Sequence, residues 1–160
     1  MNVADIMTRE VVTARADTPV PALARLMLTH GIGAIPIVDD RNIVVGIVSD
    51  HDLLRRPPSD SPRAWWLRLF DKNSVCLEEL ATARNLLARD VMGRRVRTVG
   101  ETMPVGVLGS LMRRHKLKHV PVVHDGYLVG IVSRGDLLAA LLRGIENTEE
   151  PSPAYRFFGE

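Results

Sequence analysis

The feature that most constrains the fold is an internal duplication. When the sequence is shifted by 85 residues, the segment 3–38 aligns with 88–123, and 13 of the 36 aligned positions are identical. After the loss of one residue in a turn, Val45–Ser49 matches Val129–Ser133 without a change. A repeat of this length indicates two copies of one supersecondary unit. We therefore divide the chain into a first repeat (1–54), a helical insert or linker (55–87), a second repeat (88–143) and a flexible acidic tail (144–160).

Each repeat carries the same order of strand and helix signals. In the first repeat, Thr18 and Pro19 are typical of a helix start, and Gly31 is typical of a helix end. Ser49 is the expected N-cap of a closing helix, with Asp52 three residues on. The predicted elements are strands at 11–13, 35–38 and 43–48 with helices at 18–31 and from 49, and in the second repeat strands at 96–99, 120–123 and 127–132 with helices at 104–115 and 134–143.

One unit of this size buries too little apolar surface to be stable alone. The near-continuous apolar strands at 43–48 and 128–132 are expected when both faces of a strand are covered. The sequence thus predicts an α/β (α+β) fold in which two β-α-β-β-α repeats pack as a pseudo-twofold pair. Aromatic residues make up only 4% of the chain, so aliphatic side chains must fill the core.

Charge and cysteine content bound the class of protein. The net charge of +2 is unevenly placed: residues 1–54 carry four basic and seven acidic residues, whereas 84–136 carry ten basic and four acidic. This asymmetry favours an anionic partner for the second half. The single cysteine, Cys76, excludes an internal disulfide and fits a reducing compartment. No apolar run approaches the ~20 residues of a membrane span, and we expect a cytoplasmic protein.

The insert differs in composition from the repeats. Three prolines in 55–62 exclude regular structure there, and 64–70 and 75–87 are amphipathic helix candidates. Trp65 and Trp66 are interpreted as packing or interface residues, and Cys76 as a packed small hydrophobe.

The constellation with chemical potential is a duplicated Ser-x-x-Asp, at Ser49/Asp52 and Ser133/Asp136. The carboxylate can accept bonds from ribose hydroxyls, and the start of the helix favours phosphate. The alternative is a capping box that only begins the helix, and the sequence leaves both interpretations open.

Other motifs do not support catalysis or a metal site. A P-loop is absent, and the glycines at 31 and 33 lack the third glycine of a dinucleotide fingerprint. His115 and His119 have zinc-like spacing without a third ligand. The basic run 113–119 is either a solvated helix end or a phosphate contact, and it lacks the interleaved aromatics of nucleic-acid binders.

The repeats closely resemble the CBS domain, named after cystathionine β-synthase. The resemblance covers about 1–54 and 88–143. It is carried by Asp5–Thr8, Thr18–Val20, His30–Asp39 and Gly46–Leu53, and in the second repeat by Asp90–Met92, Met103–Val105, His119–Val123 and Gly130–Leu137. It implies a compact, non-catalytic module that commonly dimerises, with crevices between the repeats that bind adenosine compounds. The Trp-Trp segment of the insert is similar to that of bacterial chains in which a BON domain follows the pair.

The resemblance implies two ligand crevices. The first would be built from Met7, Val12, Ile32, Gly33, Ala34, Ile131, Ser133 and Asp136, with Lys118, His119 and Arg134 near phosphate. The second would use Ile47, Ser49, Asp52, Met92, Arg97, Leu117 and Lys118, with Gly33, Ala34 and His51 on its phosphate side. Arg97 stands where the first crevice has Val12, so we expect the first crevice to be occupied preferentially.

The resulting hypothesis is a regulatory module, not an enzyme, that binds an adenine nucleotide of the AMP, ADP, ATP or NAD type without requiring any cofactor or metal. It would form a homodimer and transmit a conformational change to an unidentified regulated protein. Nucleic acid is not favoured as a partner, and no membrane span is expected. The alternative is a structural dimerisation module with vestigial ligand sites.

Overall fold

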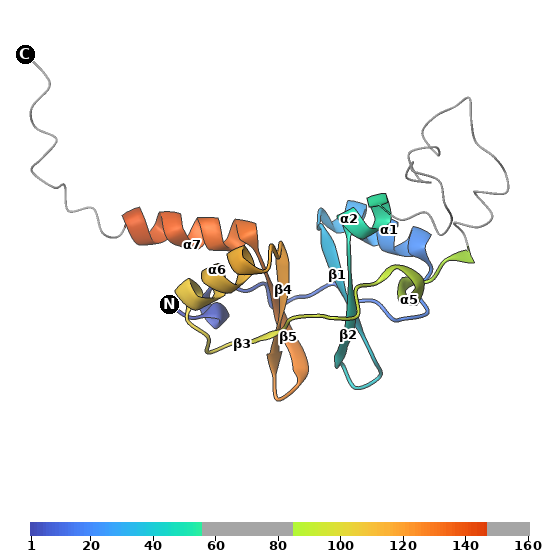
Figure 1. The fold of residues 1–160 in the computed structure, drawn as a ribbon, viewed down its shortest axis with the longest axis horizontal. Coiled ribbons are helices and arrows are strands. Elements are labelled where there is room, and N and C mark those ends of the chain that lie inside the picture. Colours follow the sequence, from blue (N-terminus) through green and yellow to red (C-terminus); the bar gives the residue numbers. More distant parts are fainter. Residues whose placement is uncertain (56–84, 147–160) are drawn as a thin grey trace, which may run out of the picture.

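The computed structural model describes residues 1–55 and 85–146. Figure 1 shows two hairpins side by side, with the helices of each half on the outer flank of its own hairpin. The elements of the first half are a 3₁₀ helix η1 (Val3–Asp5), α1 (Val20–His30), β1 (Ala34–Val38), β2 (Val44–Ser49) and α2 (Asp50–Arg55). Those of the second are α5 (Ala88–Val91), β3 (Val99–Gly100), α6 (Val105–Arg114), β4 (His119–His124), β5 (Tyr127–Ser133) and α7 (Arg134–Glu146).

The helices begin and end close to the predicted residues. α1 begins after Pro19 rather than Thr18, because Thr18 Oγ1 already accepts the N–H of Arg15 at 2.9 Å. Gly31 ends this helix in the left-handed conformation at φ 62°. The helix predicted at 64–70 lies outside the described residues. Of the helix predicted at 75–87, residues 75–84 also lie outside the described residues; Asn85 is helical, whereas Leu87 is not and forms a bridge with Pro19.

The first strand of each repeat differs from the prediction. The structure has no strand at 11–13, only a parallel bridge between Ala14 and Ile37, and β3 begins at Val99 rather than Val96. Prolines explain both differences. A parallel ladder running back from Ala14 would next need the N–H of Pro36, and one running back from Val99 would need that of Pro121. Proline has no N–H to donate, so both ladders stop at equivalent places.

The strands of the described residues form two separate sheets. β1 and β2 pair antiparallel, and β3, β4 and β5 form the second sheet, with β3 parallel to β4 and β4 antiparallel to β5. The sheets meet at their hairpin ends. Ile43 forms a bridge with Tyr127. The side-chain amide of Asn42 donates to the Leu128 carbonyl at 3.0 Å, and the Leu128 N–H donates to the Asn42 backbone carbonyl at 3.0 Å. The apolar strands predicted to be central are thus adjacent.

The two cores exchange their N-terminal segments. Val3, Ile6 and Met7, from the start of the first repeat, are buried in the core of the second repeat, among residues such as Leu108 and Val132. Ala88 and Val91, from the start of the second repeat, are buried in the core of the first. Neither repeat therefore completes its core with its own sequence.

A methionine locks each exchanged segment onto a glycine. Met7 packs on Gly130 of β5, and Met92 packs on Gly46 of β2. A Cβ atom at either glycine would overlap the sulfur of that methionine. The reciprocal bonds between Thr8 and Ile131 (2.9 and 3.0 Å) and between Gly93 and Ile47 (2.9 and 3.1 Å) fix the same segments. The identical Met and Gly of the two repeats thus hold the two halves together.

Candidate functional site

A pocket of about 220 Å³ lies where the two repeats meet. The first repeat contributes the segment after η1 and the loop between α1 and β1, and the second repeat contributes β4, β5 and the start of α7. The lining residues are Thr8, Glu10, Val11, Val12, Gly31, Ile32, Gly33, Ala34, His119, Ile131, Ser133 and Asp136.

The apolar wall of this pocket comes from Val11, Val12 and Ile32, all half-buried, together with Ile131. Val11 and Val12 are available because Pro36 prevents this stretch from joining the sheet as a strand. A flat apolar group would gain from contact with these side chains, since removal of apolar area from water is favourable at roughly 25 cal/mol per Å².

The polar end is formed by Ser133 and Asp136 at the start of α7. Asp136 Oδ2 accepts from the Ser133 backbone N–H and from its hydroxyl, both at 2.7 Å, and the Asp136 N–H donates to Ser133 Oγ at 3.2 Å. The predicted capping box is therefore formed. All these bonds to the carboxylate use Oδ2, so within the described residues Asp136 Oδ1 remains to accept from a ligand.

His119 lies at the junction of the two repeats. A Cβ atom at Gly33 would lie 3.3 Å from His119 Cε1 and 3.5 Å from Asp50 Oδ2, so the ring and this carboxylate converge on that glycine. Partial burial lowers the pKa of His119 below its ordinary value, and Lys118 and Arg134 lower it further, while Asp50 and Asp136 oppose the shift. The imidazole is hence mainly neutral at pH 7.

The structure brings together eight of the residues assigned to the first crevice: Val12, Ile32, Gly33, Ala34, His119, Ile131, Ser133 and Asp136. Met7 is instead buried against Gly130. Lys118 and Arg134 also lie outside the lining set. The Arg134 Nε donates to the Leu117 carbonyl at 2.8 Å, and its backbone N–H to that of Lys118 at 3.0 Å.

Sequence reasoning missed Thr8, Glu10, Val11 and Gly31. Thr8, Glu10 and Val11 all lie between the assigned residues Met7 and Val12, so their position in the sequence was a signal that could have found them. Glu10 is the only carboxylate that the first repeat adds to this lining.

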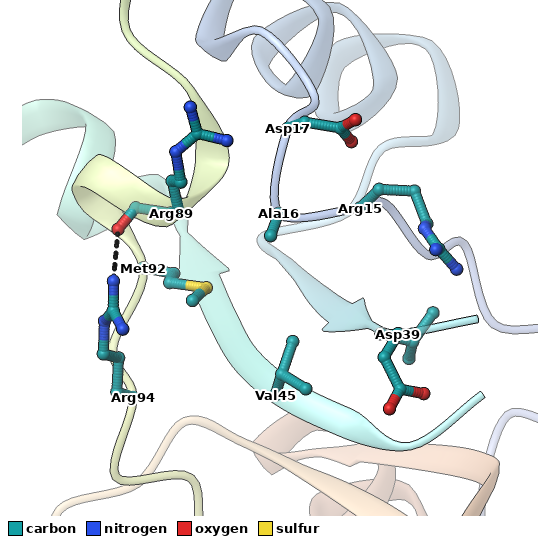
Figure 2. A pocket seen from close by; sticks show the side chains of 9 residues that line it. Arg15, Ala16, Asp17, Asp39, Val45, Arg89, Met92 and Arg94 are labelled. Carbon is teal, nitrogen blue, oxygen red and sulfur yellow. Dashed lines mark hydrogen bonds between the residues drawn. The ribbon is translucent and has the colours of Figure 1, made fainter. Parts of the chain in front are cut away.

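The second predicted crevice is less defined. Ser49 and Asp52 form the equivalent capping box at the start of α2, with bonds of 2.7 and 2.8 Å to Asp52 Oδ2. Ile47 bridges Gly93 at the related position. Met92 packs on Gly46 and lines a different groove (Figure 2), whereas Leu117 packs on the second core. Arg97 is exposed, as is His51.

Within residues 1–55 and 85–146, no group of three or more His, Cys, Asp or Glu side chains is placed to hold a metal ion. No helix in these ranges combines the length and the apolar character that crossing a membrane requires.

Two α/β units that exchange their N-terminal segments and enclose a pocket define a tandem-repeat α/β module. The CBS domain model matches residues 3–59 and 88–143. The chain belongs to the CBS-domain family, whose paired domains are generally regulatory and non-catalytic.

Three comparisons place the chain among its relatives. It is 30% identical over 155 residues to the uncharacterised protein MJ1426 of Methanocaldococcus jannaschii, covering 89% of this chain and 92% of that one. CBSX2, a CBS-pair protein from Arabidopsis thaliana, has been solved with AMP (25% identity, TM-score 0.70, 90% and 98% coverage). The CBS pair of MJ0100 has been solved with 5′-methylthioadenosine and S-adenosyl-L-methionine (25% identity, TM-score 0.66, 91% and 98% coverage). Both of these solved structures thus hold adenosine compounds.

Proposed function

We propose that the pocket between the repeats binds the adenosine part of a regulatory ligand, and that the chain is a non-catalytic cytoplasmic sensor. The observation that carries this is the pairing of an apolar wall from one repeat, Val11, Val12 and Ile32, with a ribose acceptor from the other, Asp136. Adenine and ribose need these two surfaces at adjoining positions. The AMP and S-adenosylmethionine complexes of the similar structures support the same ligand class.

Each part of the ligand has a place in this proposal. The adenine ring lies against the apolar wall, and a ribose hydroxyl donates to Asp136 Oδ1. A phosphate, as in AMP, ADP, ATP or NAD, is directed toward His119, with Lys118 and Arg134 beside it. The anchoring of Arg134 to the Leu117 carbonyl keeps that cation next to Lys118.

Ligand binding between the repeats gives a route to a regulated partner. The lining residues Thr8 and Ile131 are hydrogen-bonded to each other across the two repeats. If the segments can adopt two spacings, a ligand that binds one spacing more tightly increases the population of that spacing. The size of the shift is set by the difference between the ligand's affinities for the two.

The test is a thermal-shift series with adenosine, AMP, ADP, ATP, NADH, 5′-methylthioadenosine and S-adenosylmethionine. A ligand at 100 times its Kd adds about 2.7 kcal/mol of stability. Asp136→Asn should abolish the shift. Asp52→Asn is the matched control because it perturbs the same capping box at the start of α2, so it should lower the basal Tm similarly but retain the ligand response. If none of the compounds raises the Tm of ligand-free protein, the proposal fails.

A second candidate function, dimerisation, rests on exposed apolar side chains. Leu138, Leu141 and Leu142 on α7 are 63, 59 and 59% exposed, and Leu28 on α1 is 84% exposed. Both helices lie toward the end of the hairpins opposite their turns, α7 on the outer flank of the β4–β5 hairpin and α1 on that of the β1–β2 hairpin (Figure 1). Exposed apolar patches of this kind mark interaction sites. We propose a second copy of the chain as the occupant. Sedimentation should show a dimer that Leu141→Glu converts to a monomer, and a monomeric wild-type protein would exclude this function.

A further inference from the structure

A second pocket, of about 510 Å³, lies on the first core, between residues of the first repeat and the exchanged segment of the second, and shares no lining residue with the ligand pocket. It is lined by Arg15, Ala16, Asp17, Val38, Asp39, Val45, Arg89, Met92 and Arg94. Figure 2 shows Arg89 and Arg94 on one side, Asp17 and Asp39 on the other, and Met92 and Val45 between them. Its size falls within the range of small-molecule sites.

The cationic side has an uncommitted guanidinium. The Arg94 side chain donates to the Arg89 carbonyl at 3.4 Å, which places the two arginines together on α5 and the segment after it. Within the described ranges, the Arg89 side chain has no hydrogen-bond or ion-pair partner. A planar guanidinium recognises a carboxylate through two parallel bonds.

The opposite side is anionic. Arg15 lies there, but its charge is compensated by an ion pair with Asp40. Asp39 Oδ1 accepts from the N–H groups of Arg41 and Ile43, both at 2.9 Å, which fixes this carboxylate at the end of β1. Within residues 1–55 and 85–146, the second oxygen of Asp39 and the carboxylate of Asp17 have no hydrogen-bond or ion-pair partner, so both can accept from a cationic group.

The second repeat supplies an internal comparison. At the positions equivalent to Ala16 and Asp39 it has Glu101 and His124, whose side chains contact each other at 2.8 Å. At the equivalent surface on the second core, Ala4 and Thr102 take the places of Arg89 and Asp17. Arg94 does have an equivalent, Arg9, whose side chain donates to the Ala4 carbonyl at 3.3 Å as Arg94 does to that of Arg89. The combination of Arg89 with Asp17 and Asp39 is thus confined to this pocket, and the duplicated fold does not require it.

We propose that this pocket binds a small dipolar molecule of the α-amino-acid type. The carboxylate contacts Arg89 and Arg94, the ammonium group contacts Asp17 and Asp39, and an apolar side chain packs on Met92 and Val45. A ligand with only one charge would leave one side of the pocket without a counter-charge.

L-Leucine is the probe, and the readout is the methyl resonance of Met92 in the full-length protein. We expect a saturable shift for L-leucine. N-acetyl-L-leucine, which lacks the ammonium group, and L-leucinamide, which lacks the carboxylate, should each bind about tenfold or more weakly, because each loses a charge-assisted pair. Equal binding of the three compounds, or no saturation with L-leucine, overturns the proposal.

Variants of exposed residues locate the contacts without disturbing the core. Arg89→Gln and Asp17→Asn should each weaken L-leucine binding by about tenfold. Arg113→Gln, at an exposed position on α6, is the matched charge control and should bind like the wild type. Asp136→Asn should also leave L-leucine binding unchanged, which separates this pocket from the adenosine pocket. An Arg89→Gln variant with wild-type affinity contradicts the assignment.

Discussion

Replacement of Gly130 by alanine tests whether the exchanged segments hold the two halves together. The added Cβ would overlap Met7 Sδ, and it would lie 3.0 Å from Met7 Cγ and 3.2 Å from the Thr8 carbonyl oxygen. The sulfur can move, but the carbonyl oxygen is fixed by its bond from the Ile131 N–H at 3.0 Å. Overpacking of a tight site costs about 1–3 kcal/mol. For a chain of this length, that corresponds to a loss of roughly 3–10 °C in Tm.

Urea denaturation is the assay, with a double-mutant cycle as its control. Met7→Ala alone removes buried volume and costs about 2–5 kcal/mol. In the double variant the new Cβ occupies space that the Met7 side chain vacated. The double variant should therefore lose less unfolding free energy than the sum of the two single losses, by at least 0.5 kcal/mol, which is roughly the threshold for coupling between contacting residues. Gly109→Ala lies in α6 with open space around it and should instead stabilise by about 0.5–1 kcal/mol. A Gly130→Ala variant as stable as the wild type would refute the conclusion that the contact between Met7 and Gly130 holds the exchanged segment in place.

Three further predictions concern the ligand pocket. The pKa of His119 is lower in the folded state, so as pH falls the unfolded state takes up the proton first. The stability that depends on neutral His119 is therefore complete above the unfolded pKa of about 6.5 and is lost as pH falls toward the folded pKa. In a plot of unfolding free energy against pH, His119→Gln should flatten the slope in that window. Gly33→Ala brings a Cβ within 3.3 Å of His119, so in calorimetric titrations with AMP it should lower affinity with little change in Tm. Ser133→Ala removes a capping hydroxyl and should cost about 0.5–2 kcal/mol in chemical denaturation, and Ser49→Ala should cost a similar amount.

Much of the fold could be predicted because the signals for each helix and strand occur twice, once in each repeat. Gly31, Pro36 and the Ser-x-x-Asp pairs have local effects, and local effects can be read from local sequence. The short first strands were the exception. The information was present in Pro36 and Pro121, but its consequence depends on which N–H the parallel ladder needs, and that requires the register of β1 and β4.

The exchange of N-terminal segments could not be predicted from the repeat. Identical sequences in the two repeats are equally compatible with each segment packing on its own repeat or on the other. Met7 shows the consequence: its place in the alignment suggested a ligand contact, whereas the crossing of the chain buries it on Gly130. The same crossing brings Thr8 and Glu10 to the pocket, and the signal for both was their position between Met7 and Val12 rather than a motif of their own.

The exchange also bears on how a ligand could be sensed. Thr8 lines the pocket, pairs with Ile131, and follows directly after Met7, which is locked on Gly130. A segment of the first repeat is therefore part of the second core and of the pocket wall at once. A change in the spacing between that wall and Asp136 cannot be absorbed by the first repeat alone, because the wall is anchored in both cores. Packed cores shift between discrete arrangements rather than deforming continuously, so the proposed ligand would act on the relative position of the two halves.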